Sequence, residues 1–225
     1  MELLTNGVGL SVVVFFPLIS AFIITLIPKA QEQLIKGFAL VSSLITFVLS
    51  AVLLFQFDFS SADKLQLGNK ISWIKSINAN YEIGIDGISL PLLVLSTFIT
   101  VLAIIYSIEH LPEPKSPKGF LALILVLETG MNGTFVALDL ILFFVFFEIV
   151  LLPMYFMIGI WGDKTVRTVS GFKNQIETRL YASIKFFVFT LFGSAFMLLG
   201  FLGLYYRGNK TFSIPELIEL GTSGA

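Results

Sequence analysis

The chain has 225 residues, of which 56% are apolar and only 13% are charged, and its mean hydropathy is +0.92. Soluble domains carry about 25% charged residues, so this composition excludes a soluble globular fold and predicts a membrane protein. The net charge of −1 leaves no basic surface that could neutralise phosphates, and we expect no nucleic acid partner.

The residue types that bind metals and redox cofactors are almost missing. The chain has no cysteine and a single histidine, His110. Without thiolates it cannot hold an iron–sulfur cluster or a disulfide, and one histidine cannot build a haem or zinc site alone. We therefore expect no cofactor and no redox centre in this chain.

Six apolar stretches are long enough to cross a bilayer as helices, since about 30 Å of hydrocarbon takes about 20 residues. They are apolar on every face, whereas the wall of a membrane barrel would alternate apolar and polar residues. We therefore predict an all-α polytopic membrane helix bundle of about six transmembrane helices. The first stretch has neither a basic flank nor a small-residue cleavage site, so we expect it to be retained. The helices are expected at residues 8–27, 37–57, 87–108, two within 119–160, and 183–206.

The boundaries on either side of the fourth helix rest on local signals. Three prolines between residues 112 and 117 forbid a continuous helix after the third span. The apolar run 119–160 is twice the length of a span, and the polar cluster Asn132-Gly133-Thr134 with Asp139 predicts a tight turn within it. We divide that run there into the fourth and fifth helices.

Two segments are expected outside the membrane. Residues 58–86 are too polar to span and contain Trp73 and Tyr81, which are favoured at the headgroup level. In the tail, Ser213-Ile214-Pro215-Glu216 predicts a helix that begins with proline in its first turn. Residues 221–225 are expected to form a loop after that short helix.

Lysine and arginine in the short loops predict the orientation, because they collect on the cytoplasmic side. One side of the predicted bundle carries eight of them and the other carries five, so we place the first side in the cytoplasm and the N-terminus outside. The first set is Lys29, Lys36, Lys115, Lys118, Lys164, Arg167, Lys173 and Arg179, and the second is Lys64, Lys70, Lys75, Arg207 and Lys210.

Glu148 is the strongest candidate for a functional residue. It lies in the middle of the fifth span, and a carboxylate at the bilayer centre costs about 2.5 kcal/mol or more. Such a group is suited to take up and release protons, although a permanently protonated acid bonded to a neighbouring helix is the alternative. Pro153 removes the hydrogen bond to the carbonyl of Ile149, which leaves an acceptor for water or a partner beside Glu148. An ordinary helix kink is the other interpretation of that proline.

Four further residues are weaker candidates. Glu128 lies near the middle of the fourth span, where it is a second possible proton carrier unless Thr129 satisfies it locally. Lys185 lies just inside the sixth span, so it either extends to the interface or serves as a basic partner in a relay. Asp86 precedes the third span, where a carboxylate stabilises a helix N-terminus, which is a structural role. His110 lies in the proline-rich loop and is expected to be solvated.

Three motifs resemble the antiporter-like, proton-translocating subunits of respiratory complex I, of the subunit M or mitochondrial subunit 4 type. They are Gly84-Ile85-Asp86-Gly87-Ile88-Ser89-Leu90-Pro91, the segment from Leu140 through Glu148 to Tyr155, and Lys185-Phe186-Phe187-Val188-Phe189-Thr190. The resemblance extends from about residue 8 to about residue 220.

The resemblance implies a larger protein. Members of that family have about fourteen helices with inverted repeats, and the glutamate at the position of Glu148 works with a lysine on the seventh helix, which this sequence does not reach. It implies three leading helices in residues 1–118, the start of the first proton half-channel in 119–206, and a tail or loop in 207–225. We therefore expect a fragment, truncated before the seventh helix.

The resemblance also implies the surroundings of the chain. It would lie in a bacterial inner (cytoplasmic) membrane as a subunit of the enzyme NADH:quinone oxidoreductase, among other membrane subunits and lipid. NADH, quinone, flavin and iron–sulfur clusters would bind to other subunits. Two alternatives remain open: a subunit of a multi-subunit sodium/proton antiporter, and a structural membrane scaffold.

Overall fold

The computed structural model describes residues 7–114, 116–167 and 176–223, so the predicted positive charges Lys115 and Lys173 lie outside the described residues. Six long helices dominate this part of the chain, and each is long and apolar enough to cross a membrane. The prediction of a polytopic helix bundle with six spans is therefore confirmed. The helices are α1 (Val8–Leu26), α2 (Glu32–Gln56), α3 (Ser89–Glu109), α4 (Pro117–Val136), α5 (Leu140–Trp161) and α6 (Thr178–Arg207).

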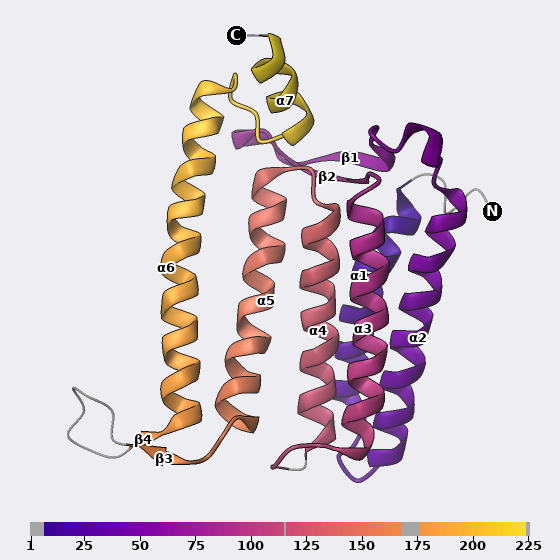
Figure 1. Ribbon diagram of the computed structural model, residues 1–225, viewed down its shortest axis with the longest axis vertical. Coiled ribbons are helices and arrows are strands. Elements are labelled where there is room, and N and C mark those ends of the chain that lie inside the picture. The colour runs from indigo at the N-terminus through magenta and orange to yellow at the C-terminus, as the bar shows by residue number, and fades with distance from the viewer. Residues whose placement is uncertain (1–6, 115, 168–175, 224–225) are drawn as a thin grey trace.

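The six helices fall into two groups (Figure 1). The first four form a packet in which α1 contacts α2 and α4, and α3 contacts the same two helices. Then α5 packs on α4, and α6 packs on α5 at the edge of the molecule. We call α1–α4 the helix packet and α5–α6 the outer pair.

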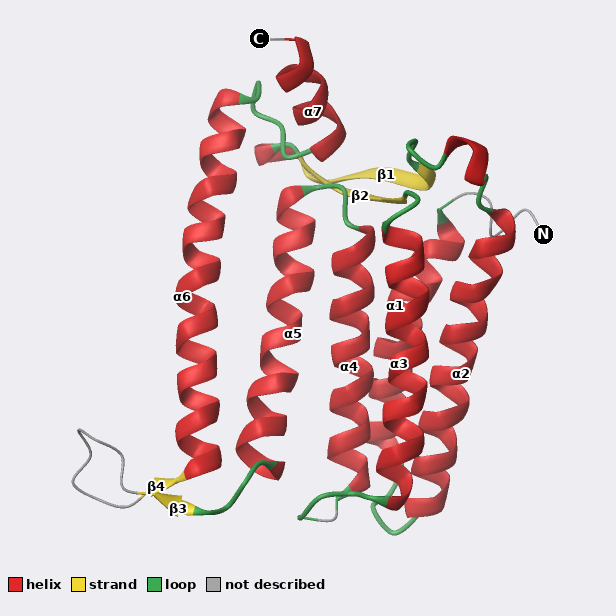
Figure 2. Cartoon of the chain, in the orientation of Figure 1, coloured by secondary structure: helices red, strands yellow, loops and turns green. Residues whose placement is uncertain are grey.

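The loop between α2 and α3 forms a β-hairpin, which the sequence did not predict. Its strands β1 (Gln66–Ile74) and β2 (Ala79–Ile85) pair antiparallel and lie across one end of the helices (Figure 2). The chain reverses at Asn78, whose φ of 53° belongs to the left-handed region that asparagine tolerates. Short 3-10 turns, η2 (Phe59–Ser61) and η3 (Lys75–Ile77), precede the two strands.

The predicted turn between the fourth and fifth helices is confirmed at Asp139 and wrong at Asn132-Gly133-Thr134. Asn132, Gly133 and Thr134 all lie within α4, and the Thr134 hydroxyl donates to the Gly130 carbonyl at 2.8 Å. The break comes at Asp139, whose carboxylate accepts the first free N–H groups of α5, those of Ile141 (2.9 Å) and Leu142 (3.1 Å). The capping carboxylate, and not the Asn-Gly pair, therefore marks the boundary.

The last part of the chain differs from the prediction at both of its helices. Helix α6 begins at Thr178, five residues before the predicted Ser183, after the short paired strands β3 (Val166–Arg167) and β4 (Ile176–Glu177). Helix α7 (Ile214–Ser223) begins beside Pro215, as predicted. It continues to Ser223, so residues 221–223 are helical and only Gly224 and Ala225 of the expected loop lie outside the described residues.

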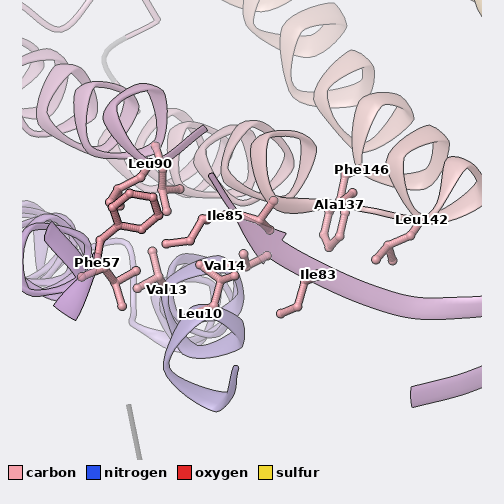
Figure 3. Packing of buried hydrophobic residues seen from close by; sticks show 13 residues of the cluster. Leu10, Val13, Val14, Phe57, Ile83, Ile85, Leu90, Ala137, Leu142 and Phe146 are labelled. Atoms are coloured by element: carbon pink, nitrogen blue, oxygen red, sulfur yellow. The ribbon is translucent and has the colours of Figure 1, made fainter. Parts of the chain in front are cut away.

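The packet has two apolar clusters, one toward each end. The hairpin-side cluster joins the ends of the four helices to strand β2 (Figure 3), which is why the hairpin lies flat against the bundle. The far cluster lies at the opposite end. The first comprises Leu10, Val13, Val14, Leu53, Phe57, Ile83, Ile85, Leu90, Leu93, Val136, Ala137, Leu142 and Phe146, and the second Ala21, Ile24, Ile35, Ala39, Ile104, Leu121, Ala122, Ile124 and Leu125.

Candidate functional site

Glu148 lies near the midpoint of α5 and is half-buried. One of its carboxylate oxygens, Oε1, is buried and has no hydrogen-bond partner among the described residues. A helix interior offers no free backbone donor, because each N–H is already bonded one turn back. The Glu148 side chain therefore has a free hydrogen-bond acceptor near the bilayer centre, where water is scarcest.

Glycines of α4 show which side of α5 faces the packet. A Cβ added at Gly133 would lie 2.2 Å from the ring of Phe146, and one at Gly130 would lie 2.7 Å from Val150 Cγ2. Glu148 is two residues from both Phe146 and Val150, and two residues turn an α-helix by about 200°. The carboxyl therefore lies on the opposite face of α5, away from α4.

That opposite face is covered by α6. The rings of Tyr155 and Phe187 lie 5.4 Å apart between centroids. Tyr155 comes seven residues after Glu148 and Phe187 comes seven residues before Ser194, so the antiparallel register places Ser194 opposite Glu148. Ser194 is buried, and its hydroxyl donates to the Leu191 carbonyl at 3.1 Å. It is the polar side chain of α6 at the level of the carboxyl.

Lys185 is not brought to Glu148. It follows Ser183 by two residues, and Ser183 faces α5 because a Cβ on Gly159 would lie 3.3 Å from its hydroxyl oxygen. Lys185 consequently lies on the outer face of α6, exposed, with its Nζ 5.5 Å from the centre of the Tyr181 ring. Cation–π contact of this kind stabilises a lysine near an interface.

Glu128 is more deeply buried than Glu148. Its exposed fraction is 0%, and neither carboxylate oxygen has a hydrogen-bond partner among the described residues. Thr129, its possible local partner, instead donates to the Leu125 carbonyl at 3.2 Å. Glu128 is two residues from Gly130, which contacts α5, so it points into the packet. The two carboxyls therefore face away from one another on neighbouring helices.

The remaining candidates lie at the helix ends. The Asp86 carboxylate accepts the N–H groups of Ile88 (2.9 Å) and Ser89 (2.7 Å) at the start of α3. Although burial opposes the charge, these bonds outweigh it and lower the pKa of Asp86. His110 is exposed, and its ring stacks on Tyr106 with centroids 4.6 Å apart. Pro153 lies inside α5 and is buried, five residues after Glu148.

Sequence reasoning found Glu148, because a single acid within an apolar run is conspicuous. It missed Ser194, since a serine costs little in a membrane helix and only the register between α5 and α6 reveals its position. No cluster of three or more histidine, aspartate or glutamate side chains suited to a metal occurs within residues 7–114, 116–167 and 176–223.

The arrangement of the spans and the hairpin defines a class of membrane protein. A chain in the solved respiratory complex I from Thermus thermophilus with bound NADH superimposes on 93% of this chain with a TM-score of 0.73 and 22% sequence identity. That likeness shows a shared fold, the antiporter-like fold of complex I membrane subunits. This chain covers 39% of the Thermus chain.

The sequence places the chain within that class. Residues 12–134 match the family described as NADH-ubiquinone oxidoreductase chain 4, amino terminus, and residues 137–224 match the family described as NADH:quinone oxidoreductase/Mrp antiporter, TM. The chain belongs to the NADH-ubiquinone oxidoreductase chain 4 family.

Two relatives illustrate the relationship. The chain is 36% identical over 213 residues to F(420)H(2) dehydrogenase subunit M of Methanosarcina mazei, and 33% identical over 214 residues to NADH-quinone oxidoreductase subunit M of Rickettsia prowazekii. The matches cover 92% and 94% of this chain but only 39% and 40% of the relatives. The chain thus spans about two fifths of the length of the curated relatives that it matches.

Proposed function

We propose that the chain is the N-terminal part of a proton-translocating membrane subunit of NADH:quinone oxidoreductase, and that Glu148 takes up and releases the proton. One observation carries this proposal: a half-buried carboxyl in the middle of a spanning helix, one oxygen of which has no hydrogen-bond partner in the part of the chain that the structure describes. Carboxyls are costly at that depth and mark proton paths in membrane proteins. A structural role would leave no reason for the unpartnered oxygen.

The groups on the α6 side of Glu148 favour a proton relay over a permanently protonated acid. Ser194 offers a hydroxyl opposite the carboxyl, and a hydroxyl can both donate and accept a hydrogen bond. The family resemblance implies a further partner for this carboxyl, a lysine on a seventh helix. Lys185 lies on the outer face of α6, and Glu128 faces the packet, so neither belongs to this step.

A quinone oxidoreductase is favoured over a sodium/proton antiporter because the match to the NADH-ubiquinone oxidoreductase chain 4 family covers more than half of this sequence, residues 12–134. The names of the two relatives give different electron donors, F(420)H(2) in one and NADH in the other. A subunit shared between them is expected to leave donor binding to other subunits. NADH, quinone, flavin and iron–sulfur clusters are accordingly assigned to partner subunits.

We propose the orientation from the loops at the two ends of the bundle. In the sequence, the loops predicted on the side without the hairpin carry eight lysines and arginines, of which Lys115 and Lys173 lie outside the described residues, and the loops on the other side carry five. By the positive-inside rule the end without the hairpin faces the cytoplasm. The hairpin, the start of α1 and helix α7 then lie outside a bacterial cytoplasmic membrane.

The test is Glu148→Gln in the complete subunit within the assembled complex, reconstituted into proteoliposomes. We expect NADH-driven proton pumping to fall at least tenfold, because the amide cannot bind a proton. Glu148→Asp is the matched control, and it should retain part of the activity because the carboxyl remains.

The alternatives predict other results. A structural scaffold predicts undiminished pumping in Glu148→Gln, with the complex assembled normally. An antiporter predicts proton movement that responds to a sodium gradient and not to NADH. Either outcome would overturn the proposal.

A further inference from the structure

The interior of the helix packet has a polar layer between its two apolar clusters. On α2, α3 and α4, most buried residues that separate the far cluster from the hairpin-side cluster are polar, and the exceptions are Val101, Gly130 and Gly133. On α1 the corresponding stretch holds Pro17 and Ser20. The layer comprises Ser20, Ser42, Ser43, Thr46, Ser50, Thr97, Thr100, Glu128, Thr129 and Asn132, and the exposed fraction of each is 3% or less.

The unpartnered groups of this layer lie at neighbouring depths. Ala39 and Leu125 belong to the same apolar cluster, and α2 and α4 run in the same direction (Figure 1). Ser42 comes three residues after Ala39, and Glu128 comes three residues after Leu125, so the two side chains lie level. Asn132 lies one turn beyond Glu128 on the same face of α4.

Hydroxyl groups in the layer are largely satisfied. Ser50 and Thr97 are 2.7 Å apart between their hydroxyl oxygens, which joins α2 to α3. Ser96 donates to Asn132 Oδ1 at 3.3 Å, which joins α3 to α4 and shows that Asn132 points into the packet. Three groups remain without a hydrogen-bond partner among the described residues: both oxygens of Glu128, Nδ2 of Asn132 and Oγ of Ser42.

Unpartnered polar groups in one buried layer require a ligand. A buried polar group without a hydrogen bond destabilises the fold, and three such groups lie at neighbouring positions here. Internal water characteristically satisfies such groups with about three hydrogen bonds per molecule. An amide donor and a carboxyl with two oxygens, one helical turn apart, suit a bridging water.

We propose that the polar layer of the packet binds internal water and that Glu128 is its proton-binding group, which forms a second proton site separate from Glu148. Glu128 is the only carboxyl or amine among the buried residues that the structure describes on α1–α4. The other polar residues of the layer carry hydroxyl or amide groups: Ser20 on α1, Ser42, Ser43, Thr46 and Ser50 on α2, Thr97 and Thr100 on α3, and Thr129 and Asn132 on α4. None of these titrates in the physiological range, so the proton exchanges only through water.

The two apolar clusters seal the layer at both ends. The residues of these clusters are almost fully buried, and they occupy the packet above and below the polar layer. The layer is therefore a closed site that holds a proton, and exchange requires the packet to open. Because neither Glu148 nor any residue of α6 belongs to the layer or to the two clusters, the second site does not depend on the role proposed for Glu148.

The first experiment measures the proton by infrared spectroscopy of the assembled complex. We expect the carbonyl stretch of a protonated carboxylic acid in the wild type, its loss in Glu128→Gln, and its retention in the control Glu148→Gln. We expect slow transfer of this band to its deuterated position in D2O. A spectrum of Glu128→Gln that equals the wild type would overturn the proposal.

The second experiment distinguishes a hydrated layer from a dry one through the sign of a stability change. In a hydrated layer, Glu128→Leu leaves the water, Asn132 and Ser42 without a hydrogen-bond partner. We therefore expect the melting temperature to fall by roughly 5 °C. The double variant Glu128→Leu/Asn132→Leu should recover part of this loss. In a dry layer, Glu128→Leu removes an unsatisfied group and raises the melting temperature, which would contradict bound water. Ordered water between Glu128 and Asn132 in a high-resolution map of the wild type tests the same point without a substitution.

Discussion

The helix packet and the outer pair each hold a glutamate near the middle of a spanning helix, but the two glutamates differ in burial. Glu128 has an exposed fraction of 0% inside four helices that complete its surroundings. Glu148 is half-buried between two helices, and α6 has only Ser183 and Ser194 buried among its described residues. A carboxyl that is fully buried can store a proton, whereas a half-buried one can exchange it with groups on another helix. The difference in burial therefore separates two roles for the same residue type.

The contact between α4 and α5, where the two regions meet, provides the largest expected effect. Gly133→Ala places a Cβ 2.2 Å from the Phe146 ring, which must shift together with part of the hairpin-side cluster. Overpacking of this kind costs about 1–3 kcal/mol. We expect roughly 2 kcal/mol, measured as a lower melting temperature of the purified protein in detergent.

The matched control for that substitution lies in the outer pair. Gly193 on α6 has no atom within 4 Å of an added Cβ. Gly193→Ala should leave the melting temperature unchanged or raise it slightly, because alanine favours a helix over glycine by up to about 1 kcal/mol. If both variants destabilise the protein equally, the packet is no more tightly packed than the outer pair, and the comparison between them fails.

A smaller effect is expected at Ser194, which tests whether the side of Glu148 that faces α6 matters. Ser194→Ala removes the hydroxyl opposite the carboxyl, and a neutral hydrogen bond is worth about 0.5–1.5 kcal/mol. We expect NADH-driven pumping by the assembled complex to slow roughly fivefold, with a changed pH profile of pumping.

Ser183 is the control for this substitution, because it is also buried on the α5 side of α6 but lies near the β4 end of the helix. Ser183→Ala should leave the pH profile of pumping as in the wild type. Equal effects of the two substitutions would mean that Ser194 only packs the helices and does not position Glu148.

Hydropathy predicted the six spans because each must match the bilayer by itself, whatever its neighbours. Which side of each helix points into the bundle, in contrast, depends on contacts between helices. Asn132-Gly133-Thr134 resembles a turn in sequence, yet Asn132 bonds to Ser96 and Gly133 fits against Phe146, so the polar residues stay helical. The same limit made Glu128 the weaker candidate, since depth along the chain carries no information about burial. The hairpin was missed because its strands are fixed by packing of β2 on the helix ends.

The smallest expected effect concerns the link that joins the two regions outside the membrane. Lys70 on β1 bonds to Glu82 of β2 (3.2 Å) and to Glu216 of α7 (2.7 Å), so it connects the hairpin over the packet to the segment that follows the outer pair. Burial opposes the charge of Lys70, but bonds to Glu216 and Glu82 outweigh it and raise the pKa of the lysine. The hydrogen bonds from Lys70 and Thr211 lower the pKa of Glu216 below its usual 4.5.

The direction of the Glu216 shift sets the pH dependence. A carboxyl with a lowered pKa stabilises the fold at pH values above about 4.5, and this contribution is lost as the pH falls through the lower pKa of the folded protein. Because both partners are largely exposed, the contribution is about 0.2–1 kcal/mol. Glu216→Gln should therefore lower the melting temperature slightly at pH 7 and hardly at all near pH 3. A difference that persists undiminished at low pH would show that α7 is held by its apolar contacts around Phe212 and not by this link between the two regions.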